Sequence, residues 1–268
     1  VIVSVSDGTQ TIMAAIAVSI KPSLDENTIT VETPGTLSKL LSDYDKSSIT
    51  ELTIIGSLNN SDIATLKSLP NLTILDMENV NIGALLSRAF YQKTSLTSVK
   101  LPKTLKTIGN SAFYGCSNLT TVTICNSLTS IGESAFHNCN LTSIIIPDNV
   151  TSIGAGAFWA CSSLTTITIS NNITSIEECT FYGCSSLTNV TIPDSVTSIG
   201  TSAFAECSSL TVVTIGNNVT SIGDFAFRDC SSLTTIYCKA QTPPEMTYSG
   251  FENLYHCTLY VPVGCKDA

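Results

Sequence analysis

The chain contains two histidines, the residue type that most often serves as a general base. Neither of them is placed for catalysis. His137 occupies a position at which equivalent segments carry Tyr, Trp, Ala or Arg, so we interpret it as a surface position. His256 directly precedes Cys257, and neighbours in a strand point to opposite faces. Neither histidine forms the nucleophile–base pair that covalent catalysis needs. The adjacent Glu177 and Glu178 are interpreted as solvated charges in a turn. The sequence therefore predicts no catalytic residue and no enzyme.

Eleven cysteines raise the question of a metal site or a disulfide framework. Zinc sites combine two short-spaced pairs of ligands, whereas Cys179 and Cys184 have no second pair nearby. An odd number of cysteines also cannot be fully paired within one chain. Six of them recur in register instead: Cys116, Cys139, Cys161, Cys184, Cys207 and Cys230. Free cysteine is among the most buried residue types, so we predict packing positions, with no metal and no cofactor.

The composition excludes two classes of partner. The 268 residues carry a net charge of −9, and no Lys or Arg occurs between Lys106 and Arg228. Nucleic acid requires a basic face, so we predict that none is bound. The most apolar early run, Ile12 to Ile20, is shorter than the ~18–20 residues that a membrane-spanning helix needs. This segment is therefore not expected to insert into a membrane.

The elements that must position these residues are set by a repeat. Eight phenylalanines recur at spacings of 22 to 24 residues: Phe90, Phe113, Phe136, Phe158, Phe181, Phe204, Phe227 and Phe251. A second series gives the same period: Leu52, Leu75, Val99, Val122, Ile144, Ile167, Val190, Val213, Ile236 and Leu259. A period near 23 lies within the range of leucine-rich repeats.

Each unit divides into three segments. Leu-x-x-Val-x-Ile favours a short strand, Val-Thr-Ser-Ile-Gly favours a second extended segment, and x-Ser-Ala-Phe suits a single helical turn. One coil cannot bury its apolar side, but stacked coils bury a continuous core. The sequence thus predicts a leucine-rich repeat solenoid, β-rich, with right-handed coils of about 23 residues, short parallel strands and short helical turns.

The unit Ala-Phe-x-x-Cys-Ser-Ser-Leu-Thr-x-Val-x-Ile-Pro-x-x-Val-Thr-Ser-Ile-Gly resembles the BspA-type, or Treponema-type, leucine-rich repeat, from about Gly83 to Ala268. The segment from Thr242 to Pro262 resembles the terminal turn of such arrays, and Ile29 to Leu37 resembles the lead-in found in gut Bacteroides members. The resemblance implies a secreted or cell-surface bacterial protein, with its signal peptide removed or outside this chain. It further implies an adhesin for host matrix or plasma glycoproteins. No catalytic residues belong to that family.

Three regions are expected along the chain. Residues 1–33 contain two alternating apolar runs around Asp7-Gly8, which predict either a hairpin or the remnant of an upstream region. Residues 34–83 are predicted to be an N-terminal cap with irregular leucine-rich repeats, because a solenoid must cover its first coil. Residues 84–268 form the repeat array with a degenerate terminal repeat.

One candidate ligand-binding surface follows each core phenylalanine by one residue, and we call it the aromatic strip: Tyr91, Tyr114, His137, Trp159 and Tyr182. Since the phenylalanine faces inward, the next residue should face outward, with rings about 5 Å apart. Contiguous exposed aromatics mark interaction surfaces and fit protein or sugar partners. The alternative is that the rings cover the turns and shield one another.

A second, weaker candidate is the concave face of the predicted sheet, with Lys100, Thr123, Ile145, Thr168, Thr191, Thr214 and Tyr237. This face is dominated by threonine and offers few of the Trp, Tyr or Arg anchors of binding hot spots.

A further column holds Asn126, Asp148, Asn171, Asp194 and Asn217. Calcium would use such oxygens, but an amide ladder that caps turns is the simpler interpretation, because the Gly-rich nonapeptide of calcium-binding β-rolls is absent.

The sequence thus predicts a non-catalytic recognition protein that binds another protein. Two alternatives stay open: a carbohydrate-binding module that uses the aromatic strip, and a structural spacer that displays another domain.

Overall fold

The computed structural model describes residues 27–246, 249–252, 254, 256–263 and 265, together with strands β1 (Ile2–Ser6) and β2 (Thr11–Ala15). β1 and β2 pair antiparallel, with Ile2 opposite Ala15 and Ser6 opposite Thr11. The expected turn at Asp7-Gly8 lies outside the described residues. The assignment of residues 1–33 as an N-terminal hairpin or as the remnant of an upstream region stays a prediction.

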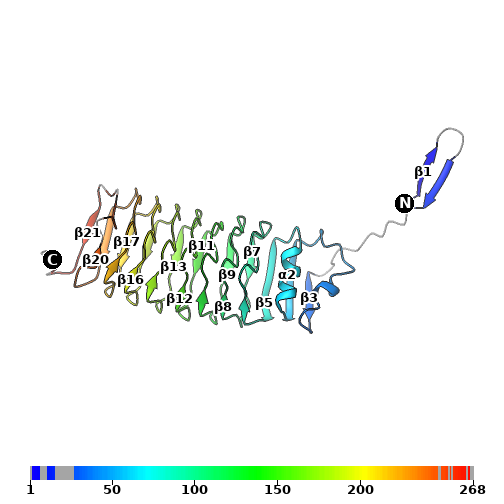
Figure 1. Ribbon diagram of the computed structural model, residues 1–268, viewed down its shortest axis with the longest axis horizontal. Helices are drawn as coiled ribbons and strands as arrows, with labels where there is room; N and C mark the ends of the chain where they lie inside the picture. The colour runs from blue at the N-terminus through cyan, green and yellow to red at the C-terminus, as the bar shows by residue number, and fades with distance from the viewer. Residues whose placement is uncertain are drawn as a thin grey trace.

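From residue 27 onward the chain winds into an elongated solenoid whose coils stack side by side along its longest axis (Figure 1). Parallel strands line one side of the coils in three successive sheets: β3 (Thr28–Val31), β4 (Glu51–Ser57), β5 (Ile74–Asn81), β7 (Ser98–Lys100) and β9 (Thr121–Thr123); β11 (Ser143–Ile145) and β13 (Thr166–Thr168); β15 (Asn189–Thr191), β17 (Val212–Ile215), β19 (Thr235–Cys238) and β21 (Thr258–Tyr260). Equivalent residues are paired, such as Val99 with Val122 and Val213 with Ile236. The repeat period predicted from the sequence is confirmed.

A second row of two-residue strands lines another side of the coils. It comprises β6 (Ala84–Leu85), β8 (Thr107–Ile108), β10 (Ser130–Ile131) and β12 (Ser152–Ile153), and then β14 (Ser175–Ile176), β16 (Ser198–Ile199), β18 (Ser221–Ile222) and β20 (Glu245–Met246). In each pair from β8 to β18 the isoleucine points inward, as Ile131 and Ile199 do at 2% exposure.

This second row is divided between β12 and β14, where Glu177 replaces a recurring glycine. At the equivalent Gly154 and Gly200, the N–H donates to the preceding coil at 2.9 and 2.7 Å. A Cβ on Gly154 would lie 2.4 Å from the main-chain nitrogen of Glu133 in that coil, so the close approach requires glycine. In this described stretch, the Glu177 N–H makes no such bond to Ile153. A side chain at this position therefore holds the two coils apart.

The two helices described in the chain, α1 (Leu37–Leu40) and α2 (Asn60–Ser68), lie in its less regular first coils. Asn59 caps α2, and its side chain accepts from the N–H groups of Ser61 and Asp62. The buried carboxylate of Asp62 accepts in turn from the N–H groups of Gly35 at 2.6 Å, Leu37 at 3.0 Å and Asn59 at 3.0 Å. One carboxylate thus joins the starts of both helices. That these coils act as a cap remains a prediction.

The turn segments around each phenylalanine differ from the single helical turn expected. In every regular coil the residues two before and two after the phenylalanine adopt positive φ, as Ser134 at 54° and Asn138 at 55° do around Phe136. N–H groups then alternate in direction: Phe113 donates to Ala135 of the next coil, and Tyr114 donates to Ser111 of its own coil. A helix would use every N–H within one coil. The chain instead uses half of them to join neighbouring coils.

Phenylalanine and cysteine columns form the core, as predicted. The Phe rings stack with centroids 5.1 to 5.5 Å apart from Phe90 to Phe251. Each column thiol donates to the main-chain carbonyl of the phenylalanine one coil earlier, as Cys116 does to Phe90 at 3.1 Å. In the first coil of the column Lys93 replaces the cysteine, and its buried ammonium donates to the carbonyl of Leu69 at the end of α2. Burial lowers the pKa of Lys93.

Candidate interaction surfaces

The structure brings the five residues of the aromatic strip together. Ring centroids are 5.0 Å apart for Tyr91 and Tyr114, 4.4 Å for Tyr114 and His137, 5.0 Å for His137 and Trp159, and 5.2 Å for Trp159 and Tyr182. The consecutive turn segments position them, since each ring follows a buried phenylalanine. The result is one continuous row of rings along the turn side of the solenoid.

The rings of the strip cover one another rather than lying open to solvent. The four flanking rings are half-buried, and Trp159 is the most exposed at 37%. Tyr91 and Tyr114 are nearly parallel, with 13° between their planes, whereas Trp159 is tilted by 38° from His137 and by 54° from Tyr182. Stacking along the solenoid axis therefore leaves ring edges outermost, and the tilt opens part of the Trp159 face.

Charged groups lie at both ends of the strip. The cations of Lys67 and Arg88 lie 5.8 and 5.3 Å from the centroid of Tyr91, in cation–π contact. At the other end the Tyr182 hydroxyl donates to the carboxylate of Glu206, which raises the pKa of Tyr182. Arg228 lies 3.9 Å from that carboxylate. Within the strip, burial lowers the pKa of His137 and so favours the neutral imidazole.

The concave-face residues occupy equivalent positions on the exposed side of the three successive sheets. They are Lys100, Thr123, Ile145, Thr168, Thr191, Thr214 and Tyr237, all exposed except the half-buried Thr214. At the first of these positions Lys100 pairs with Asp76 at 2.8 Å. Despite partial burial, which opposes ionisation, the hydrogen bond from Lys100 holds the pKa of Asp76 below its usual value. Ile145 is 70% exposed and stands alone among threonines.

The end of this series of positions contains an aromatic pair that the sequence reasoning missed. Tyr260 lies opposite Tyr237 across β19 and β21, and their rings stack at 5.0 Å. Both are about half exposed, and together with Lys239 they border a hollow of about 400 Å³. The position of Leu259 in the repeat series could have placed Tyr260 among them.

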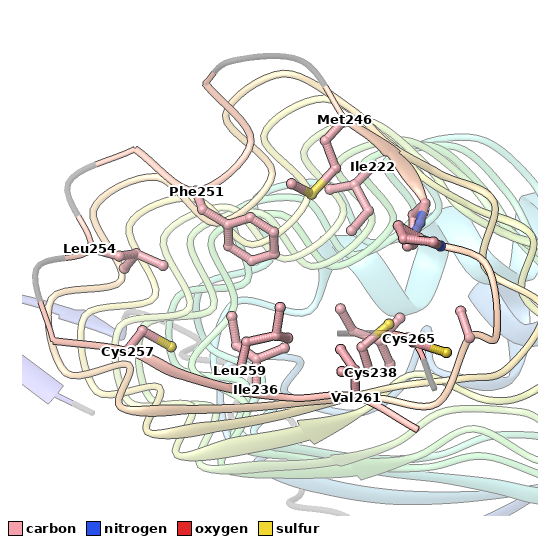
Figure 2. A pocket seen from close by; sticks show the side chains of 14 residues that line it. Ile222, Ile236, Cys238, Met246, Phe251, Leu254, Cys257, Leu259, Val261 and Cys265 are labelled. Atoms are coloured by element: carbon pink, nitrogen blue, oxygen red, sulfur yellow. The ribbon is translucent and has the colours of Figure 1, made fainter. Parts of the chain in front are cut away.

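The last coils of the solenoid enclose an apolar cavity of about 650 Å³ that opens at the C-terminal end. Figure 2 shows Phe251, Leu254 and Leu259 around it, with the thiols of Cys238 and Cys265 on one wall. Across the described residues, no group of three or more His, Cys, Asp or Glu side chains is arranged to hold a metal ion.

The Asn/Asp column forms an amide ladder. The Asn171 N–H donates to Asp148 Oδ1 at 2.9 Å, and the Asn217 N–H donates to Asp194 Oδ1 at 3.0 Å. Asn172 further donates its side-chain amide to the main-chain carbonyl of Asp148 at 2.6 Å. Each of these carboxylates accepts from the coil that follows it, so the amide-ladder interpretation is confirmed at these positions.

Comparison with protein families decides the classification. A model of the BspA type leucine rich repeat region matches the chain in six copies, over residues 41–142, 84–185 and 151–262. The chain belongs to this family. The match spans most of the coils described above and both candidate surfaces of this BspA-type protein. A comparison with curated proteins found no match.

Solved structures similar to this BspA-type chain are bacterial leucine-rich repeat proteins. One from T. pallidum is 22% identical, with 83% of this chain and 79% of that chain covered and a TM-score of 0.48. One from Bacteroides ovatus is 22% identical, with coverage of 97% and 75% and a TM-score of 0.47. A leucine rich cell surface protein from Faecalibacterium prausnitzii is 23% identical, with coverage of 98% and 87% and a TM-score of 0.40. Within the described residues, no helix is long and apolar enough to span a bilayer.

Proposed function

We propose that this BspA-type protein is a non-catalytic adhesin, secreted or held at the cell surface, that binds another protein through the aromatic strip. The continuity of the strip carries this proposal: five rings in five consecutive coils present one row of edges on the turn side of the solenoid. Tyr and Trp supply large contact area at low entropic cost and are enriched in binding hot spots. Host matrix or plasma glycoproteins are the partners that the family suggests.

The geometry favours a protein partner over a free sugar. A sugar ring binds by stacking its apolar face on an open aromatic face, whereas neighbouring rings cover most faces of this strip. Only the tilted Trp159 opens part of a face. A protein can use the row of edges as well as that face, because side chains approach aromatic edges favourably.

A binding screen tests the proposal. The wild-type protein is passed over immobilised matrix and plasma proteins and over a glycan array, beside Trp159→Ala and Tyr237→Ala variants whose melting temperatures match. Loss of one hot-spot residue is expected to weaken protein binding by ~30-fold for Trp159→Ala, whereas Tyr237→Ala on the other face binds as the wild type does. Protein binding that withstands Trp159→Ala would remove the strip from the proposal. Binding to glycans alone would indicate the carbohydrate module, and binding to neither would indicate the spacer.

A further inference from the structure

The turn segments that carry the aromatic strip are acidic and carry no basic side chain along their central coils. No Lys or Arg occurs between Lys106 and Arg228 in the sequence. Glu133, Glu178 and Asp224 each lie three residues before the core phenylalanine of their coil, and all three are exposed. The main-chain bonds from Ser111 to Glu133, from Gly156 to Glu178 and from Ser202 to Asp224 show that this position lines up from coil to coil.

The acidic column, Glu133, Glu178 and Asp224, has one acid in every second coil. Neighbouring coils are spaced by 5.1 to 5.5 Å at the phenylalanine rings, so the acids follow one another at about twice that distance. This spacing is about one Debye length at physiological salt, which limits their mutual repulsion. Gly156 donates its N–H to the main-chain carbonyl of Glu178 at 2.9 Å, and a Cβ on Gly156 would lie 3.4 Å from the ring of Trp159. The column therefore runs beside Trp159 and gives that part of the strip a negative border.

The chain itself supplies cations at the two ends of the strip. Lys67 and Arg88 lie over the ring of Tyr91, and Arg228 lies next to Glu206, the partner of the Tyr182 hydroxyl. Between these ends lie the tilted Trp159 and the acids Glu133 and Glu178, for which the described residues provide no cation. The centre of the strip thus combines an aromatic surface with negative charge, and it lacks the cations that lie at the two ends of the strip.

We propose that the centre of the strip, from His137 to Tyr182, binds a basic, extended segment of the partner protein. Lysine or arginine side chains of that segment lie against Trp159 and pair with Glu178 and its neighbours in the acidic column. This inference rests on the proposed function and specifies the chemistry of the partner. The same negative border repels anionic partners such as sulfated polysaccharides.

A polyproline-type segment with a basic residue at every third position fits this surface. Such a segment repeats every three residues over ~9.3 Å, close to the distance across two coils of the solenoid. Successive basic residues can therefore reach successive acids of the column without bending the segment.

The single tryptophan of the chain is Trp159, so tryptophan fluorescence reports directly on the proposed site. A twelve-residue synthetic peptide of Arg-Pro-Pro triplets is titrated into the full chain, and the matching Glu-Pro-Pro peptide serves as control. We expect a saturable change in Trp159 emission with the arginine peptide alone. At about 1 M NaCl, where the Debye length falls to ~3 Å, the response should be largely lost.

Charge variants distinguish binding at this surface from a general attraction of the basic peptide to an acidic protein. Glu178→Gln should weaken binding by up to about fivefold, as expected for an exposed charge pair, and Glu178→Gln with Glu133→Gln should weaken it further. Glu51→Gln removes the same charge from the sheet face and should leave the affinity unchanged. Equal responses to both peptides, no response to either, or equal losses in Glu178→Gln and Glu51→Gln would overturn the inference. Protein binding through the strip in the screen above would still support the proposed function, so the two failures are distinguishable.

Discussion

The thiol of Cys161 donates a hydrogen bond to the main-chain carbonyl of Phe136, one coil earlier, at 3.1 Å. The same bond recurs at 3.1 to 3.3 Å for the other five column cysteines. Cysteine fills the core as a small apolar group and also completes the second acceptor site of that carbonyl. The cysteine column is therefore a packing and hydrogen-bonding feature.

The column thiols should resist alkylation in the native protein. Burial raises the pKa of Cys161 and of Cys230 to about 12, about three units above the ordinary thiol value, so the thiolate population is roughly a thousandfold lower. Maleimide labelling at pH 8 with peptide mass spectrometry should find the half-buried Cys125 and Cys265 modified first. Column cysteines should react only after denaturation, and rapid native labelling of Cys161 would contradict this account.

Glu177→Gly should stabilise the solenoid. Glycine would let β12 and β14 join and would restore the main-chain bonds that Thr174 and Glu177 do not make to the preceding coil. Two bonds contribute ~0.5–1.5 kcal/mol each, against an entropic cost of ~0.5–1 kcal/mol for glycine, so a net gain of about 1 kcal/mol is expected in guanidinium unfolding.

Gly200→Ala is the matched test at a position where the row is intact. Its Cβ would lie 2.7 Å from the main-chain nitrogen of Glu178, so unfolding should occur at lower denaturant concentration. A stable Gly200→Ala protein beside a destabilised Glu177→Gly protein would refute the explanation of the divided row.

Acidification should protonate His137 and thereby lower the stability of the folded state. Burial lowers its pKa below 6.5, so between 6.5 and the folded value the unfolded state binds the proton and the folded state does not. Stability therefore falls as pH falls through that window. A protonated imidazole whose ring centroid lies 5.0 Å from that of Trp159 quenches its fluorescence, so emission should drop with a midpoint below pH 6.5. A His137→Gln protein should show a flat titration, and a midpoint at or above 6.5 would be inconsistent with the burial.

Asp62→Ala should strongly destabilise the first coils. It leaves the N–H groups of Gly35, Leu37 and Asn59 without their acceptor, at ~1–3 kcal/mol each where they are buried. We expect a total loss of about 3 kcal/mol or more in denaturant unfolding and faster proteolysis around α1. The exposed Glu32→Gln is the control, and similar stabilities for both variants would show that Asp62 does not hold the helices together.

The periodic features were predictable because every coil repeats the same constraint. Eight phenylalanines at spacings of 22 to 24 residues predict an inward column, and Leu-x-x-Val-x-Ile predicts its strand, regardless of local detail. The stacking of the aromatic strip followed from the same argument, since Trp159 comes directly after Phe158. Its ring tilt did not follow, because tilt depends on how unlike rings pack.

The turn conformation could not be predicted from propensity. Ser-Ala-Phe suits a helix, but Ser134 and Asn138 adopt left-handed φ so that alternate N–H groups reach the next coil. Single-coil reasoning does not include that neighbouring coil. Lys93 in the cysteine column and Glu177 in the glycine column are departures from the repeat, and their effects depend on contacts with α2 and with the preceding coil.

Hydrogen bonds between coils join equivalent residues, as Thr211 joins Thr188 and Asn217 joins Asp194. A coil inserted within the regular array would meet the same donors and acceptors on both sides that its neighbours meet now. Array length can therefore change by whole coils, about 5 Å each, without redesign of the core. The distance that the solenoid spans can therefore change in evolution through the number of coils rather than through the choice of any one residue.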